Sequence, residues 1–82
     1  MVTKIYLEKA DINQIKNLCE KFRDFRGDID CSMGVFEIDG KSLIGLLEMT
    51  ARSNVFNVKF NSDDPEEVQR FREMIREYEY DF

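Results

Sequence analysis

Stretches of alternating apolar and polar residues are interleaved with stretches whose apolar residues recur every three or four positions, and this order constrains the fold of the 82-residue chain most. Alternation is typical of a strand with one buried face, and the longer spacing is typical of an amphipathic helix. We predict strands over residues 3–8, 28–33, 35–38 and 55–60, and helices over residues 11–25, 43–50 and 65 to the end. Because every strand has a polar face, the order β-α-β-β-α-β-α predicts an α+β fold with an antiparallel sheet, wet on one side and covered by helices on the other.

Polar residues mark where the helices begin. Asp11 is a good N-cap, and Gln14 three residues later completes a capping-box pattern. Ser42 can cap the short second helix. At the third helix, Asp64 stands at the N-cap position and Pro65 at the first helical position, where its missing N–H costs nothing.

A length of 82 residues indicates one domain, which we assign to residues 1–82. Cys19 and Cys31 are too few for a disulfide framework, and each lies in the apolar phase of its segment. We therefore expect buried free thiols in a protein of the reducing cytoplasm. No apolar run is long enough for a signal peptide or a membrane span, so we expect neither.

The net charge of −5 argues against nucleic-acid or membrane binding, because such a domain repels phosphate backbones and anionic lipids. Lys21, Arg23 and Arg26 cluster around the end of the first helix. We interpret them as a solvated helix end, stabilised by the helix dipole.

The residue types present in the chain exclude several kinds of catalytic site. The chain has no histidine, which excludes the usual catalytic triads and most transition-metal sites, and no glycine-rich phosphate loop is present. Adjacent carboxylates such as Glu66 and Glu67 fall in the first turn of a helix, where the dipole favours them for structural reasons. We expect neither an enzyme nor a cofactor or metal site.

The order of elements resembles that of HPr, the small phosphocarrier of the bacterial sugar phosphotransferase system. The most specific part is Gly40-Lys41-Ser42-Leu43-Ile44-Gly45-Leu46-Leu47, which is similar to the regulatory-serine motif of that family, where Lys-Ser opens the short second helix. The segment from Asp28 to Gly40 is similar to the family's hairpin. The resemblance covers nearly the whole chain and implies an open-faced sandwich, with a four-stranded antiparallel sheet and three helices on one face.

The resemblance also implies functional positions. The family's active-site histidine falls on Asp11, and the arginine that follows it falls on Asn13, so this chain cannot carry phosphohistidine. Histidine-lacking members of the Crh type keep the serine, and the chain resembles them. By that resemblance, an HPr kinase phosphorylates Ser42, and the phosphoserine form docks onto a transcriptional regulator.

Ser42 leaves two interpretations open. As an N-cap it is explained by a structural role alone, whose loss costs about 1 kcal/mol. A phosphate there would sit at the positive end of the helix, beside apolar residues that could form a switchable interface. The surface predicted to bind a partner consists of Lys41, Leu43, Ile44 and Leu47. The alternative is a structural or assembly module that binds proteins without phosphorylation, which the aromatic and acidic tail of residues 77–82 would support.

Asp11 leaves three interpretations open. It can be a helix cap, a fixed negative charge that imitates a phosphorylated histidine, or an acyl-phosphate acceptor. The last would require a magnesium site with further carboxylates around the acceptor, and no such cluster stands close by in the sequence. We favour the helix cap.

Overall fold

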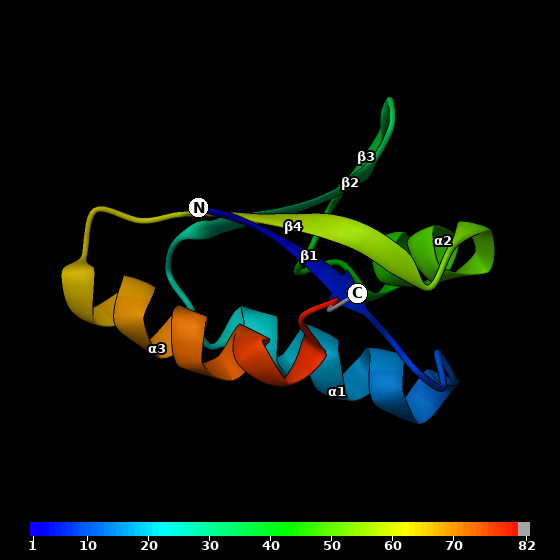
Figure 1. Ribbon diagram of the computed structural model, residues 1–82, viewed down its shortest axis with the longest axis horizontal. Helices are drawn as coiled ribbons and strands as arrows, with labels where there is room; N and C mark the ends of the chain where they lie inside the picture. The colour runs from blue at the N-terminus through cyan, green and yellow to red at the C-terminus, as the bar shows by residue number, and fades with distance from the viewer. Residues whose placement is uncertain (81–82) are drawn as a thin grey trace.

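The computed structural model describes residues 1–80, and its elements follow the predicted order (Figure 1). The strands are β1 (Val2–Tyr6), β2 (Asp28–Met33), β3 (Phe36–Asp39) and β4 (Val55–Asn61). The helices are α1 (Ile12–Arg23), α2 (Leu43–Arg52) and α3 (Pro65–Ile75), and a short 3-10 helix, η1 (Arg76–Tyr78), follows α3. The α+β fold predicted from the alternation of patterns is confirmed.

The four strands form one antiparallel sheet in the order β1-β4-β2-β3. The register places Val58 opposite Cys31, and both side chains are buried. One position along, Lys59 stands opposite Asp30 on the other face. Directly opposed residues share a face of the sheet, so the register gives one apolar and one polar face, as predicted.

Side chains from all three helices join the sheet in one core. Figure 1 shows α1 and α3 beneath the sheet and α2 against one end of it. The rings of Phe60 and Phe71 stack with centroids 4.3 Å apart and 9° between their planes. Phe25 stands edge-on to both, at 5.5 and 5.3 Å. These aromatic contacts join β4, α3 and the loop after α1 at the centre of the domain.

The predicted helix starts are confirmed by their caps. The side chains of Asp11, Ser42 and Asp64 accept hydrogen bonds from the backbone N–H groups of Gln14, Gly45 and Glu66 respectively. Pro65 occupies the first helical position of α3, as its fixed φ allows. Local capping chemistry therefore sets where each helix begins.

The third helix is shorter than predicted. α3 ends at Ile75, η1 follows, and Glu79 then pairs with Ile5 of β1. The predicted extension over residues 81–82 lies outside the described residues. Tyr78 stands three residues after Ile75, a spacing that α- and 3-10 helices share, so the apolar pattern does not reveal where the α-helix stops.

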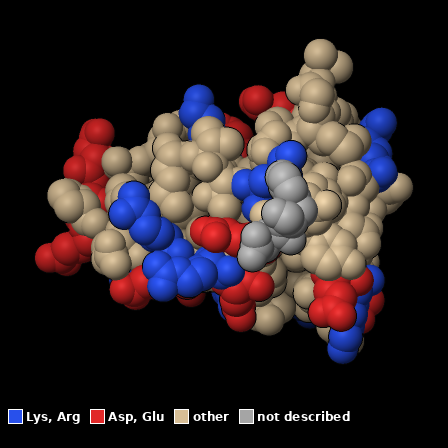
Figure 2. Space-filling view, viewed as in Figure 1, with Lys and Arg blue, Asp and Glu red and all other residues tan. Residues whose placement is uncertain are grey.

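Charge is spread unevenly over the surface. On the face shown in Figure 2, acidic side chains gather at the left end, where exposed Asp63, Asp64 and Glu66 surround the start of α3. Such an end repels anionic partners. Within residues 1–80, none of the helices combines the length and the apolar character needed to cross a bilayer.

Both thiols are expected to resist alkylation in the native protein. Cys19 and Cys31 are buried free cysteines, as predicted. Burial, with a smaller effect from the charges of Asp30 and Asp39, raises the pKa of Cys31 to about 12, so almost no thiolate forms at neutral pH. Iodoacetamide should leave the native mass unchanged at about pH 8 and modify both cysteines in denaturant. Alkylation of native Cys31 at the rate of the unfolded chain would contradict this burial.

Candidate functional site

Ser42 caps α2 from the loop that follows β3. Its backbone is extended, with φ −97° and ψ 116°, and its Oγ accepts a hydrogen bond from the Gly45 N–H at 3.1 Å. Its carbonyl oxygen accepts the first helical hydrogen bond, from the Leu46 N–H at 2.9 Å. The side chain is half-buried. The hydroxyl therefore lies where the first N–H groups of a helix concentrate partial positive charge, and where solvent can reach it.

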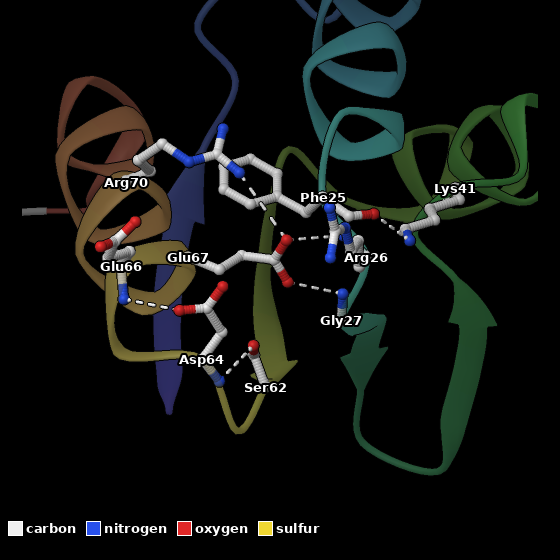
Figure 3. Close-up of polar contacts among 9 residues, drawn as sticks. All are labelled: Phe25, Arg26, Gly27, Lys41, Ser62, Asp64, Glu66, Glu67 and Arg70. Atoms are coloured by element: carbon white, nitrogen blue, oxygen red, sulfur yellow. Dashed lines mark hydrogen bonds and ion pairs between the residues drawn. The ribbon is translucent and has the colours of Figure 1, made fainter.

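Lys41 fixes the Ser42 loop to the second half of α1. Arg23 Nε donates to the Lys41 carbonyl oxygen at 2.9 Å, and Cys19 Sγ donates to the same oxygen at 3.6 Å. In the other direction, Lys41 Nζ donates to the Phe25 carbonyl oxygen at 2.5 Å (Figure 3). The ammonium predicted to contact a partner is thus engaged within the chain, and it holds the residue before Ser42 in place.

The apolar residues after Ser42 divide between the surface and the core. Ile44 is 72% exposed, whereas Leu43 and Leu47 are half-buried and pack against the core. Leu46 and Met49, on the inner side of α2, are fully buried. Beside Ser42, α2 therefore presents one largely exposed apolar side chain, with partial contributions from Leu43 and Leu47.

Asp11 is an exposed cap at the start of α1. Its Oδ1 accepts a hydrogen bond from the Gln14 N–H at 2.8 Å. Gln14 Oε1 in turn accepts from the N–H groups of Lys9 and Ala10, at 3.0 and 2.8 Å. Ala10 has a φ of 48°, in the left-handed region that costs a residue with a Cβ about 1–2 kcal/mol. The predicted capping box is therefore present in a shifted form, which helps to hold this conformation directly before Asp11.

Removal of the Asp11 cap should lower stability modestly. We expect Asp11→Ala to reduce the free energy of unfolding by about 1 kcal/mol, because the Gln14 N–H loses its partner. Asp11→Asn keeps an accepting oxygen and should cost much less. Urea unfolding followed by circular dichroism measures both, with exposed Asn13→Ala as a matched control in the same helical turn. Equal losses for the Ala and Asn variants would show that charge, rather than capping, is what matters.

Glu67 links two elements of the fold in a way that the sequence does not indicate. Glu67, in the first turn of α3, is 4% exposed, and its oxygens accept from the N–H groups of Arg26 at 2.8 Å and Gly27 at 2.7 Å (Figure 3). The hydrogen bond from Arg26 is the main cause that lowers the pKa of Glu67; burial opposes it, and Gly27 adds to it. Arg70 Nη2 lies 3.7 Å from the same carboxylate. Glu67 therefore joins α3 to the loop between α1 and β2.

The predicted solvated end of α1 is only partly correct. Lys21 Nζ forms an ion pair with Glu77 and a 2.9 Å hydrogen bond with the Tyr78 hydroxyl. The hydrogen bond to Glu77, followed by that to Tyr78, raises the pKa of Lys21. Arg23 is exposed, but its Nε donates to the Lys41 carbonyl. These two cations connect α1 to the C-terminal segment and to the Ser42 loop, in addition to facing the helix dipole.

The structure does not combine Asp11 and Ser42 into one site. The Ser42 loop contacts α1 at Cys19, which lies roughly two helical turns, or about 12 Å along the axis, beyond Asp11. Within residues 1–80, no three histidine, cysteine, aspartate or glutamate side chains are grouped so that they could hold a metal ion. Ser42 and its neighbours are therefore the candidate site, and Asp11 is a separate position.

Comparison with known proteins assigns no family to the chain: no family model matches it, and no curated protein does.

Proposed function

We propose that this chain is a regulatory HPr-like protein, related to the bacterial phosphotransferase system, that acts in the cytoplasm by binding protein partners, with phosphorylation of Ser42 as its switch. The observation that carries the proposal is the hydroxyl of half-buried Ser42 at the N-cap of α2, followed two residues later by exposed Ile44. The motif that contains both resembles the regulatory-serine motif of HPr. With no histidine, the chain cannot relay phosphate as phosphohistidine.

A phosphate on Ser42 would be compatible with the fold of α2. Phosphoserine carries nearly two negative charges at neutral pH, and the N-terminus of a helix favours negative charge. Exposed Arg23 lies on the neighbouring helix and already donates to the carbonyl of Lys41, directly before Ser42. Because the loop is held by Lys41 and α1, the new charge would be added to a surface of fixed shape. A partner could then recognise the phosphate and Ile44 together.

For Asp11 we propose a structural role. Its carboxylate accepts a hydrogen bond from the Gln14 N–H, and the exposed side chain leaves a negative charge at the start of α1. A cap accounts for this residue without phosphate transfer. The switch is therefore assigned to Ser42 alone.

The test is the intact mass of the protein after incubation with HPr kinase and ATP. We expect the mass of one phosphate on the wild-type chain and none on Ser42→Ala. Ser53→Ala is the matched control, since Ser53 is a half-buried serine at the opposite end of α2, and it should still take up one phosphate. An unmodified wild-type chain, in the same tube as an authentic HPr that is phosphorylated, would refute the switch.

The alternative function is a binding module that needs no phosphorylation, and two features of the α2 start favour it. Ile44 is exposed in the unmodified chain, and capping alone explains Ser42. Under this alternative, a partner should bind wild type and Ser42→Ala equally and lose affinity for Ile44→Asp. A partner that binds only the phosphorylated chain would favour the switch.

A further inference from the structure

The sheet has two edges, and they differ in how they are protected. The strand order places β1 at one edge and β3 at the other. β3 is four residues long and carries exposed Glu37 and Asp39, two features that discourage pairing with another strand. β1 is five residues long, and its only charged side chain is Lys4. Lys4 gives the β1 edge some protection of its own, but this edge is longer and carries fewer charged side chains than the β3 edge.

The backbone groups on the free side of β1 belong to its even-numbered residues. The Leu7 N–H donates to the Asn54 carbonyl, and the Phe60 N–H donates to the Met1 carbonyl, both at 2.9 Å. In an antiparallel pair, residues alternate between bonding to the neighbour strand and turning away from it. Odd-numbered residues of this segment thus face β4, and Val2, Lys4 and Tyr6 direct their N–H and C=O groups outward.

Residues 79–80, which we call the C-terminal strap, cover part of this edge. Glu79 forms an antiparallel bridge with Ile5, and the Tyr80 N–H donates to the Lys4 carbonyl at 2.9 Å. The Tyr80 ring stands edge-on to Tyr6, with centroids 6.2 Å apart. Figure 1 shows the red segment that follows η1 beside β1. The strap is a short additional strand on the longer and less charged edge.

The strap is anchored independently of its contacts with β1. Tyr78, directly before it, is 8% exposed and accepts the Lys21 hydrogen bond, and Lys21 also pairs with Glu77. Residues 79–80 can therefore leave the edge while Tyr78 stays in the core. The residues that cover the β1 edge are therefore distinct from the residue that holds the C-terminal segment in place.

We infer that the β1 edge is a pairing surface for a second copy of this chain, and that the C-terminal strap competes with that copy and keeps the chain monomeric. The inference is independent of phosphorylation at Ser42. Two β1 strands can pair antiparallel about Ile5, so that Ile5 of one copy stands opposite Ile5 of the other. This register places Lys4 opposite Tyr6 of the second copy. The bridge in the monomer already places Lys4 opposite Tyr80, so the strap presents the same type of side chain.

Two-fold symmetry and backbone chemistry both fit a second copy as the occupant. The register about Ile5 is self-complementary, as a two-fold axis requires, and it joins two four-stranded sheets. It also pairs Lys4 with Tyr6, the residues whose backbone groups face outward. The strap is tethered to the edge it covers, which gives it an effective concentration in the millimolar range, so it excludes a second copy at micromolar concentrations.

The test is the molar mass in solution of a chain that ends after Tyr78, compared with the full chain, by light scattering and analytical ultracentrifugation at up to about 1 mM. We expect the full chain to remain monomeric at micromolar concentration and the shortened chain to double its mass as its concentration rises. Adding Lys4→Pro to the shortened chain should restore the monomer, because proline removes an outward-facing N–H without disturbing the bonds to β4. Lys59→Ala, on the interior strand β4, is the matched control and should leave the dimer intact.

Two outcomes would overturn the inference: a shortened chain that is folded and monomeric throughout the range, or a dimer that survives Lys4→Pro. If the shortened chain does not fold, Tyr80→Pro in the full chain takes its place, since it removes the hydrogen bond to Lys4 and keeps every other residue. A folded Tyr80→Pro protein that dimerises at high concentration supports the inference, and one that stays monomeric contradicts it.

Discussion

Phe71→Ala should lower the free energy of unfolding by about 4 kcal/mol. Phe71 is fully buried, stacks on Phe60 at 4.3 Å, and meets Phe25 edge-on at 5.3 Å. Truncation to alanine removes the apolar surface of the ring and leaves a cavity among side chains from β4, α3 and the end of α1. In a domain of this size such a loss approaches the whole stability of the fold.

Urea unfolding followed by circular dichroism and by tyrosine fluorescence measures this loss. Phe71→Leu keeps most of the volume and should retain a large part of the stability. The control is Phe36→Ala. Phe36 is half-buried, and its ring centroid lies 4.1 Å from Cζ of Arg52, away from the cluster of Phe25, Phe60 and Phe71. This substitution should cost far less than Phe71→Ala. A loss below about 1 kcal/mol for Phe71→Ala would contradict the central place of this ring.

Glu67→Ala should lower the midpoint of thermal unfolding by roughly 10 °C at neutral pH. The substitution leaves the N–H groups of Arg26 and Gly27 without their partner. The loop cannot easily move to find new partners, because it packs closely on the end of β4. A Cβ at Gly27 would lie 2.3 Å from the Asn61 carbonyl oxygen. Glu67→Gln keeps one accepting oxygen, but its NH2 group would face the other backbone N–H, so its midpoint should fall between those of wild type and Glu67→Ala.

The effect of Glu67 should also depend on pH, with a sign fixed by its pKa. The folded state lowers the pKa of Glu67, chiefly through the hydrogen bond from Arg26, so the carboxylate stabilises the fold above its usual pKa of 4.5. That contribution is lost as the pH falls through the lowered pKa of the folded state. The difference between wild type and Glu67→Gln should therefore shrink from neutral pH towards about pH 3.

Differential scanning calorimetry across this range measures both effects. Glu66→Ala is the matched control, because Glu66 is the preceding residue in the same first turn but is exposed. Its midpoint should change little at any pH. A Glu67→Gln difference that stays constant down to about pH 3 would contradict the assigned role of the carboxylate.

Local signals in the sequence are sufficient to predict most of the elements of the fold. Alternation in β2 and β4 identified the buried face, where Cys31 and Val58 lie opposite one another. Asp64 followed by Pro65 identified the start of α3, because capping and a fixed φ depend only on neighbouring residues. Several boundaries differ from the prediction: β1 ends at Tyr6 instead of residue 8, α1 ends at Arg23 instead of residue 25, and α2 continues to Arg52 instead of residue 50. At the end of α3, no local signal separates an α-helix from a 3-10 helix.

Contacts between distant segments could not be predicted in the same way. Glu67 at the third helical position fits a capping pattern, and only the position of the α1–β2 loop makes it the partner of Arg26 and Gly27. Lys21 likewise reads as a cation at a helix end, although it binds Glu77 and Tyr78 far along the chain. Such partners follow from the packing of the elements, which spacing within one helix does not specify.

The candidate site likewise combines a feature that the sequence predicts with features that depend on the tertiary structure. The cap at Ser42 was predicted from the residue type and its place before a helix, and it is present. Which residues after it face solvent depends on how α2 packs, and the structure exposes Ile44 far more than Leu43 or Leu47. The engagement of Lys41 Nζ by the Phe25 carbonyl also required the tertiary structure.

The most direct test of Ser42 as the switch is the amide spectrum of ¹⁵N-labelled protein, recorded while HPr kinase and ATP act on it. The account predicts large shifts at Ser42 and in the first turn of α2, through Gly45 and Leu46, whose N–H groups bond to Ser42. Amides of Asp11 and Ser53 should stay in place, and the remaining spectrum should show an intact fold. A spectrum that does not change while an authentic HPr is phosphorylated, or shifts centred on another residue, would contradict a switch at Ser42.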